Sequence, residues 1–259
     1  MLFSQLAVEC QKIINSYQDY QVSVAIIDGE QSFLYKENQL FRAASTIKIP
    51  ILLASYLNLN DRLDTVATIP EELIVEGAGV IPFITGKLPF TYRNLMELMI
   101  IVSDNTASNA LLHSNSMHHV NHLMQKIGCK GSKIERYFMD ESAVQNGFDN
   151  YTTAKDMILM LQQIGEPGGV LNDSQRSDAL RILENQQFED MLPAYTFDEE
   201  IRYYHKTGGL TGVDHDVAII NYRQKKLYVA VLTQGWNDGF TGKKCIAEIG
   251  KVIVDYLKE

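Results

Sequence analysis

The sequence predicts an α/β fold of the α+β kind. In this fold, helices at the two ends of the chain flank a five-stranded antiparallel sheet, and an all-helical lobe lies beside the sheet. The prediction rests on the placement of the elements. β-Branched, alternating segments occur only near the two ends of the 259 residues, and the long middle shows apolar residues at helical spacing. We therefore expect a single domain over 1–259, with an α/β lobe from about 1–40 and 200–259 and a helical lobe from about 45–190.

The first third of the chain begins with a helix and a hairpin. The run VSVAIID is rich in β-branched residues and ends at Asp28-Gly29, a turn signal, before a second short strand. The next helix carries Pro50 early, where a first turn tolerates proline. In chain order we expect a helix at 4–17, strands at 22–28 and 32–35, a helix at 45–57 and irregular chain at 66–90.

Helices fill the middle, and strands return only near the end. Thr91 is a good N-cap for a very apolar helix, and Thr152 or Thr153 caps a later one. The next expected elements are helices at 92–102, 105–113, 117–127, 152–164 and 172–183. They are followed by strands at 203–206, 216–222 and 227–233 and a last helix at 242–257.

Composition and charge exclude several classes of protein. The chain has 23 basic and 32 acidic residues, giving a net charge of -9, whereas nucleic-acid binding needs a basic face. No stretch reaches the roughly 18 apolar residues of a membrane helix. The three cysteines, Cys10, Cys129 and Cys245, are far apart and indicate neither a disulfide framework nor a zinc site. We expect a monomer with no nucleic-acid or membrane partner.

The N-terminus predicts the location of the protein. It reads as an amphipathic helix and lacks the basic start, apolar run and cleavage site of a signal peptide. The expectation for the sequence as given is therefore the cytoplasm. If a leader was removed from it, the expectation is a secreted or periplasmic protein.

The first chemical motif is Ser45-Thr46-Ile47-Lys48, which places a hydroxyl and an amine one helical turn apart. A serine becomes a nucleophile when a base takes its proton, and a lysine whose pKa is lowered by burial can act as that base. Backbone N–H groups at a helix N-terminus could stabilise an oxyanion beside it. Alone, the motif is a weak signal and is more typical of a helix N-cap with a solvated lysine.

Two further motifs give this one its meaning. Ser103-Asp104-Asn105 falls at the break between two expected helices, and Lys206-Thr207-Gly208-Gly209 begins the second group of strands. The three motifs, their order and the order of elements resemble the class A β-lactamases and the penicillin-binding proteins across essentially the whole chain. The resemblance implies a β-lactamase/transpeptidase-like fold, a serine acyl-hydrolase without metal or cofactor, and a small β-lactam or peptidoglycan-like acyl substrate.

The resemblance also implies a role for each catalytic residue. Ser45 would be the acylated nucleophile and Lys48 its proton acceptor. Ser103 would relay a proton to the leaving nitrogen from a place between the two lysines. Asn105 would bind the substrate amide and Lys48, and Lys206 would lower the pKa of Lys48 by like charge.

Other residues of the motifs would bind substrate or shape the site. Thr207 would hold the substrate carboxylate together with Lys206, and the N–H groups of Ser45 and Gly209 would form the oxyanion hole. Gly208 is expected to leave room for the substrate along the strand. Asp104 is expected to fix its turn by hydrogen-bonding backbone.

The sequence departs from the class A pattern in the loop that supplies the deacylating glutamate two residues after an arginine. Here Phe138 stands two residues after Arg136, and the carboxylates Asp140 and Glu141 come later. Either the loop is reshaped and one of these acids serves, or no dedicated base exists. With phenylalanine at that position, we expect slow deacylation.

A second departure follows the third motif. Where class A enzymes commonly place an arginine for the substrate carboxylate, residues 213–217 hold acids and a histidine. The leading hypothesis is β-lactam hydrolysis. The alternatives are a D-alanyl-D-alanine carboxypeptidase-like or esterase activity, or a penicillin-binding protein that deacylates slowly.

Overall fold

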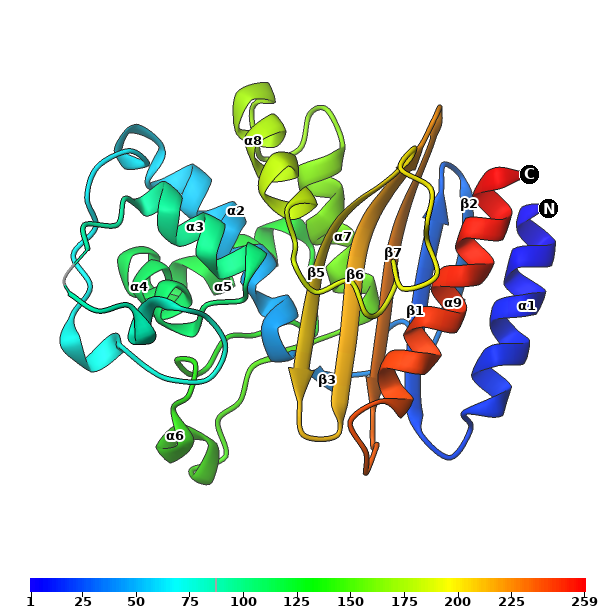
Figure 1. The fold of residues 1–259 in the computed structure, drawn as a ribbon, viewed down its shortest axis with the longest axis horizontal. Coiled ribbons are helices and arrows are strands. Elements are labelled where there is room, and N and C mark those ends of the chain that lie inside the picture. Colours follow the sequence, from blue (N-terminus) through cyan, green and yellow to red (C-terminus); the bar gives the residue numbers. More distant parts are fainter. Residues whose placement is uncertain (87) are drawn as a thin grey trace.

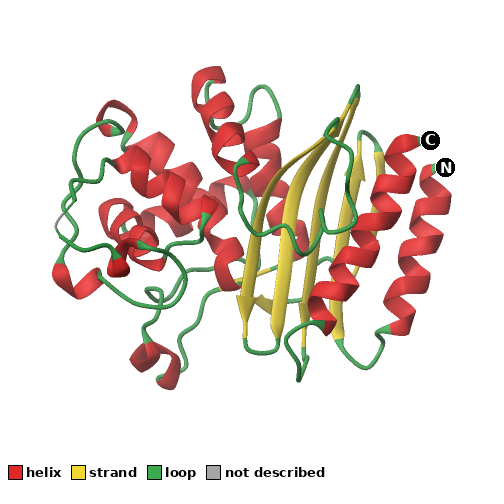
Figure 2. Cartoon of the chain, in the orientation of Figure 1, coloured by secondary structure: helices red, strands yellow, loops and turns green. Residues whose placement is uncertain are grey.

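One antiparallel sheet of five strands, in the order β2-β1-β7-β6-β5, forms the frame of the molecule (Figure 1). The computed structural model describes residues 1–86 and 88–259. The strands are β1 (Gln21–Asp28), β2 (Gln31–Tyr35), β5 (Ile201–Leu210), β6 (Val213–Tyr222) and β7 (Lys225–Gln234). Helices α1 (Phe3–Ser16) and α9 (Thr241–Lys258) pack together on one side of the sheet, and the other helices lie on the opposite side (Figure 2). This arrangement confirms the predicted fold class.

The sheet separates two hydrophobic cores, and β7 shows how one strand serves both. Its side chains alternate between the two faces, as the pleat of a strand requires. Leu227, Val229 and Val231 belong to the core under α1 and α9. Tyr228, Ala230 and Leu232 belong to the core under the helical lobe. A strand buried on both faces needs apolar residues at nearly every position, which β7 has.

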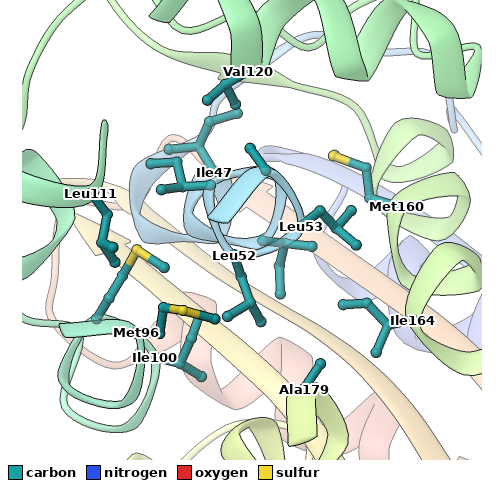
Figure 3. Close-up of a cluster of buried hydrophobic side chains, with 14 of the residues drawn as sticks. Ile47, Leu52, Leu53, Met96, Ile100, Leu111, Val120, Met160, Ile164 and Ala179 are labelled. Carbon is teal, nitrogen blue, oxygen red and sulfur yellow. The ribbon is translucent and has the colours of Figure 1, made fainter. Parts of the chain in front are cut away.

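The helical lobe surrounds α2 (Lys48–Asn58), the helix that follows the nucleophile motif. Leu52 and Leu53 on α2 face apolar side chains from the neighbouring helices, among them Met96, Leu111 and Ile164 (Figure 3). Because α2 is enclosed, the residues at its start are held rigidly. The other helices on this side of the sheet are α3 (Tyr92–Ile101), α4 (Asn105–Asn115), α5 (Met117–Ile127), α6 (Glu141–Gln145), α7 (Ala154–Gly165) and α8 (Asp173–Glu184).

The observed elements differ from the expected ones in four respects. A 3₁₀ turn (Ala44–Ile47) precedes α2, so the expected helix does not begin at Ser45. The short strands β3 (Phe41–Arg42) and β4 (Tyr151–Thr152) pair with each other, and α6 forms in the loop after Phe138; the sequence indicated none of these. The last three strands are also longer than expected. In the part of the chain that the structure describes, every helix is too short or too polar to span a lipid bilayer.

Candidate active site

Ser45 lies on the 3₁₀ turn and is half-buried at the edge of β5. The turn packs closely against this strand. A Cβ atom on Gly208 would come within 3.0 Å of the backbone nitrogens of both Ser45 and Thr46, which is closer than atoms normally approach. The glycine therefore lets the strand reach the backbone of the turn. This differs from the expected reason, room for substrate, because the obstacle is the protein itself.

Lys48 is fully buried at the start of α2 and donates three hydrogen bonds. They reach the Ser103 carbonyl oxygen at 2.7 Å, Ser103 Oγ at 3.1 Å and Asn105 Oδ1 at 3.0 Å. Burial, and then the charge of Lys206, hold the pKa of Lys48 well below its usual value. In the described chain no hydrogen bond joins Lys48 to the Ser45 hydroxyl, a contact that apo sites often complete only with substrate.

Ser103 lies between the two lysines. Its Oγ is 3.1 Å from Lys206 Nζ and 3.1 Å from Lys48 Nζ, and its backbone has a left-handed φ of 57°. Burial lowers the pKa of Lys206 to about 7, and the carboxylate of Asp216 opposes that change. A hydroxyl between two amines of lowered pKa has the geometry of a proton relay.

Asp104 fixes the turn that carries Ser103 and Asn105, as predicted. Its carboxylate accepts hydrogen bonds from the backbone N–H groups of Ala107 at 2.9 Å, Val80 at 2.6 Å and Ile81 at 2.9 Å. It thus caps α4 and also ties the irregular segment near residue 80 to the site. The sequence did not indicate this segment as part of the site.

The side chain of Phe138 lies beside Lys48. Its ring centroid lies 4.6 Å from Lys48 Nζ, and the side chain is buried. The side chain of Asn109 accepts from the Phe138 N–H at 2.8 Å and donates to its carbonyl oxygen at 3.1 Å, so the backbone is held from both sides. Asn109 is a positioning residue that the sequence analysis missed, since an asparagine within a helix has no distinctive spacing.

The two loop carboxylates take different places. Asp140 accepts a hydrogen bond from the Ala143 N–H at 2.9 Å and caps α6, and Glu141 is exposed in the first turn of that helix. Both line the same pocket as Ser45. The structure thus places an aromatic ring at Lys48 and keeps one of the two acids occupied as a helix cap.

The site opens into a pocket of 650 Å³. Ser45, Asn105, Phe138 and Gly209 line it, together with Arg42 and Arg136 and the segments 77–78, 139–141, 144–145 and 210–211. Arg42 Nε donates to Asp149 at 2.7 Å, and Arg136 Nε donates to the same carboxylate at 2.8 Å. Burial alone would raise the pKa of Asp149, but these donors keep it below its usual value. The sequence analysis did not identify Arg42.

The acids and the histidine after the third motif have structural roles. Asp216 pairs with Thr207 across the strands and is buried. Its carboxylate accepts a hydrogen bond from the Leu192 N–H at 3.1 Å, and His205 Nδ1 lies 3.0 Å from the same carboxylate. Burial lowers the pKa of His215 to about 4, so the ring is neutral at pH 7, and its Nε2 donates to the Arg42 carbonyl oxygen at 2.8 Å. Neither Asp216 nor His215 therefore presents a positive charge beside Thr207.

The sequence and the fold are similar to those of known β-lactamases and of a penicillin-binding protein. Residues 5–257 match a family described as the beta-lactamase enzyme family. A beta-lactamase from Sphaerobacter thermophilus is 28% identical over 100% of this chain and 98% of that chain, with a TM-score of 0.89. A variant of PBP-A, solved as an acyl-enzyme complex with penicillin G, is 22% identical over 98% of this chain and 97% of that chain, with a TM-score of 0.88. A class A beta-lactamase from Mycobacterium abscessus is 17% identical over 97% of this chain and 100% of that chain, with a TM-score of 0.86. No curated protein matches the sequence.

Proposed function

The chain belongs to the beta-lactamase enzyme family, and we propose that it is a penicillin-binding serine hydrolase. It forms an acyl-enzyme on Ser45 and releases the acyl group slowly. The observation that carries the proposal is the ring of Phe138, 4.6 Å from Lys48 Nζ. The acylating groups are assembled around Lys48, whereas phenylalanine supplies no base for the second half of the reaction.

Acylation uses the groups in a simple order. Lys48 takes the proton of Ser45, whose oxygen attacks the β-lactam carbonyl carbon, and the N–H groups of Ser45 and Gly209 hold the oxyanion. When the carbonyl–nitrogen bond breaks, Ser103 gives its proton to the nitrogen and is reprotonated from a neighbouring lysine amine, 3.1 Å away on either side. The product is an ester between Ser45 and the opened substrate.

Release needs a water molecule and a base to take its proton. Phe138 has no proton acceptor, and Asp140 already accepts a hydrogen bond from the backbone of α6. We therefore propose that acylation outpaces hydrolysis and that the acyl-enzyme accumulates with ordinary penicillins.

Two other activities remain candidates. Glu141 lines the pocket and is exposed, which favours a β-lactamase of full turnover if this carboxylate reaches the ester. Residues 213–217 hold acids and a histidine where class A enzymes commonly place an arginine for the substrate carboxylate, which favours a D-alanyl-D-alanine carboxypeptidase-like or esterase activity.

Mass spectrometry of the intact protein after exposure to benzylpenicillin separates these functions. A mass gain of one penicillin on the Ser45 peptide that persists supports the proposal. A transient gain with ring-opened product identifies a β-lactamase. Turnover of esters or of D-alanyl-D-alanine peptides with no penicillin adduct rules out penicillin binding.

Replacing Phe138 by glutamate should accelerate release. A carboxylate beside Lys48 could activate the deacylating water, and a well-placed general base contributes roughly 10²–10⁴-fold, so even a poorly placed one should be measurable. Pre-steady-state kinetics with a chromogenic cephalosporin should show a burst in the native protein and faster steady turnover in Phe138→Glu, with Phe138→Gln as the uncharged control. A linear trace in the native protein, with turnover lost in Asp140→Asn or Glu141→Gln, would instead assign the base to the loop acids.

The pH dependence of acylation should reflect the loss of the proton from the Lys206 amine. Its amine has a pKa of about 7, so it carries charge below that pH and loses it as the pH rises. A substrate carboxylate held by this amine should bind less well above about pH 7. The measurement is the ratio of acylation rate constants for benzylpenicillin and its methyl ester, because the ratio cancels the titration of Lys48. A ratio that stays constant through neutral pH contradicts carboxylate binding by Lys206.

A further inference from the structure

Resting on the proposed acyl-enzyme chemistry, we propose that Arg42 makes the pocket selective for acyl groups whose side chain carries a carboxylate. Nothing in the three sequence motifs involves this residue. The inference follows from where Arg42 lies and from how its charge is balanced.

In the proposed complex the parts of the substrate follow one another along β5. In the proposed complex the substrate carboxylate lies at Thr207 and the oxyanion at Gly209, two residues further along the strand. The acyl side chain extends from the carbonyl carbon on the side opposite the leaving nitrogen, toward Leu210 and Thr211 at the end of β5. Arg42 lines the same pocket as Ser45, Gly209, Leu210 and Thr211. In the proposed complex its guanidinium would therefore be within the pocket that receives the acyl side chain.

The charges near Arg42 do not cancel. Asp149 is a single carboxylate shared by two guanidinium groups, which leaves one positive charge in excess. Arg42 donates to it through Nε only. Within the described residues its two terminal nitrogens have no hydrogen-bond partner, and its side chain is 37% exposed, against 11% for Arg136. A guanidinium fork with free N–H groups suits a carboxylate.

The backbone of Arg42 is fixed more firmly than that of a surface arginine. It pairs with Tyr151 between β3 and β4, and His215 donates to its carbonyl oxygen from a buried position. Two acids that line the same pocket, Asp140 and Glu141, oppose an anion, but they belong to the start of α6, and Asp140 already caps that helix. The pocket thus has a cationic wall at β3 and an acidic edge at α6.

Carbenicillin and benzylpenicillin test the inference, because they differ by one carboxylate on the acyl side chain. The readout is the rate constant for acylation of Ser45 by carbenicillin divided by that for acylation by benzylpenicillin. In Arg42→Gln this ratio should fall about tenfold, the order of one charge-assisted hydrogen bond. It should stay unchanged in the control Arg223→Gln, which removes an exposed guanidinium bound to Glu200. Arg42→Lys should keep part of the preference, since it keeps the charge.

A second measurement covers the case in which Arg42→Gln does not fold. In the native protein, the ratio should fall as sodium chloride is added, because salt screens a partly exposed charge pair. A ratio that Arg42→Gln leaves unchanged, or one that is independent of salt, overturns the role of Arg42 while the acyl-enzyme proposal stands. Failure of both penicillins to acylate the native protein refutes the proposed function itself.

Discussion

Replacing Ser45 by alanine is expected to abolish covalent labelling by benzylpenicillin. Ser103 and Asn105 accept hydrogen bonds from Lys48, the residue that ends the 3₁₀ turn carrying this hydroxyl, and in the proposed mechanism these groups act on Ser45. The cysteines cannot substitute for it, because burial raises the pKa of Cys10, Cys129 and Cys245 to about 12 and leaves them as protonated thiols. The measurement is the intact mass after incubation with the penicillin.

The matched control for this variant is Ser114→Ala. Ser114 is also half-buried, but its hydroxyl only donates to the Ala110 carbonyl oxygen at 2.9 Å, away from the pocket. It should label as the native protein does. An adduct that survives in Ser45→Ala would place the nucleophile elsewhere and would remove the basis of the proposed mechanism.

Replacing Lys48 by alanine should slow acylation by roughly 10²–10⁴-fold, the usual contribution of a general base. The amine is fully buried, and burial together with the charge of Lys206 lowers its pKa, which favours the neutral amine that can accept the Ser45 proton. Stopped-flow acylation of Ser45 measures the effect. The exposed Lys12→Ala, which loses only an ion pair to Glu9, is the control.

The pH profile separates a base from a merely structural lysine. In the native protein acylation should rise with pH as Lys48 loses its proton, and in Lys48→Ala this rise should disappear. Removing the amine also takes the Lys48 hydrogen bond away from the Ser103 carbonyl oxygen and from Asn105 Oδ1, so thermal unfolding of the variant should be recorded in parallel. Equal acylation rates in variant and native protein would contradict the assigned role.

The sequence predicted the elements that depend on local patterns. The alternation of β7 and the cap at Thr91 are written in adjacent residues, and both appear in the structure. The ends of the late strands were missed for a physical reason. Lys206-Thr207-Gly208-Gly209 has low strand propensity, and its extended form is fixed by the ladder to β6, where Thr207 pairs with Asp216.

The motifs predicted the residues around Lys48, and the structure brings Ser103, Asn105 and Lys206 together there. Their catalytic roles stay predictions until they are tested. Phe138 could be identified in the sequence as a departure, but its contact with Lys48 depends on the Asn109 side chain, 29 residues away in the chain. Arg42 could not be found at all, because its place in the pocket depends on the pairing of β3 with β4.

The close approach of β5 to the nucleophile turn has a genetic consequence. Every missense change in the codon of Gly208 adds a Cβ atom, and that atom would lie 3.0 Å from the Ser45 nitrogen. The next codon differs, since a Cβ on Gly209 meets only Asp214 Oδ1, at 3.9 Å. In a saturation library sorted by capture on a fluorescent penicillin, variants at 208 should vanish while Gly209→Ala persists. Neutral drift is therefore expected to replace Gly209 but not Gly208, because a side chain at 208 would displace the turn that carries Ser45.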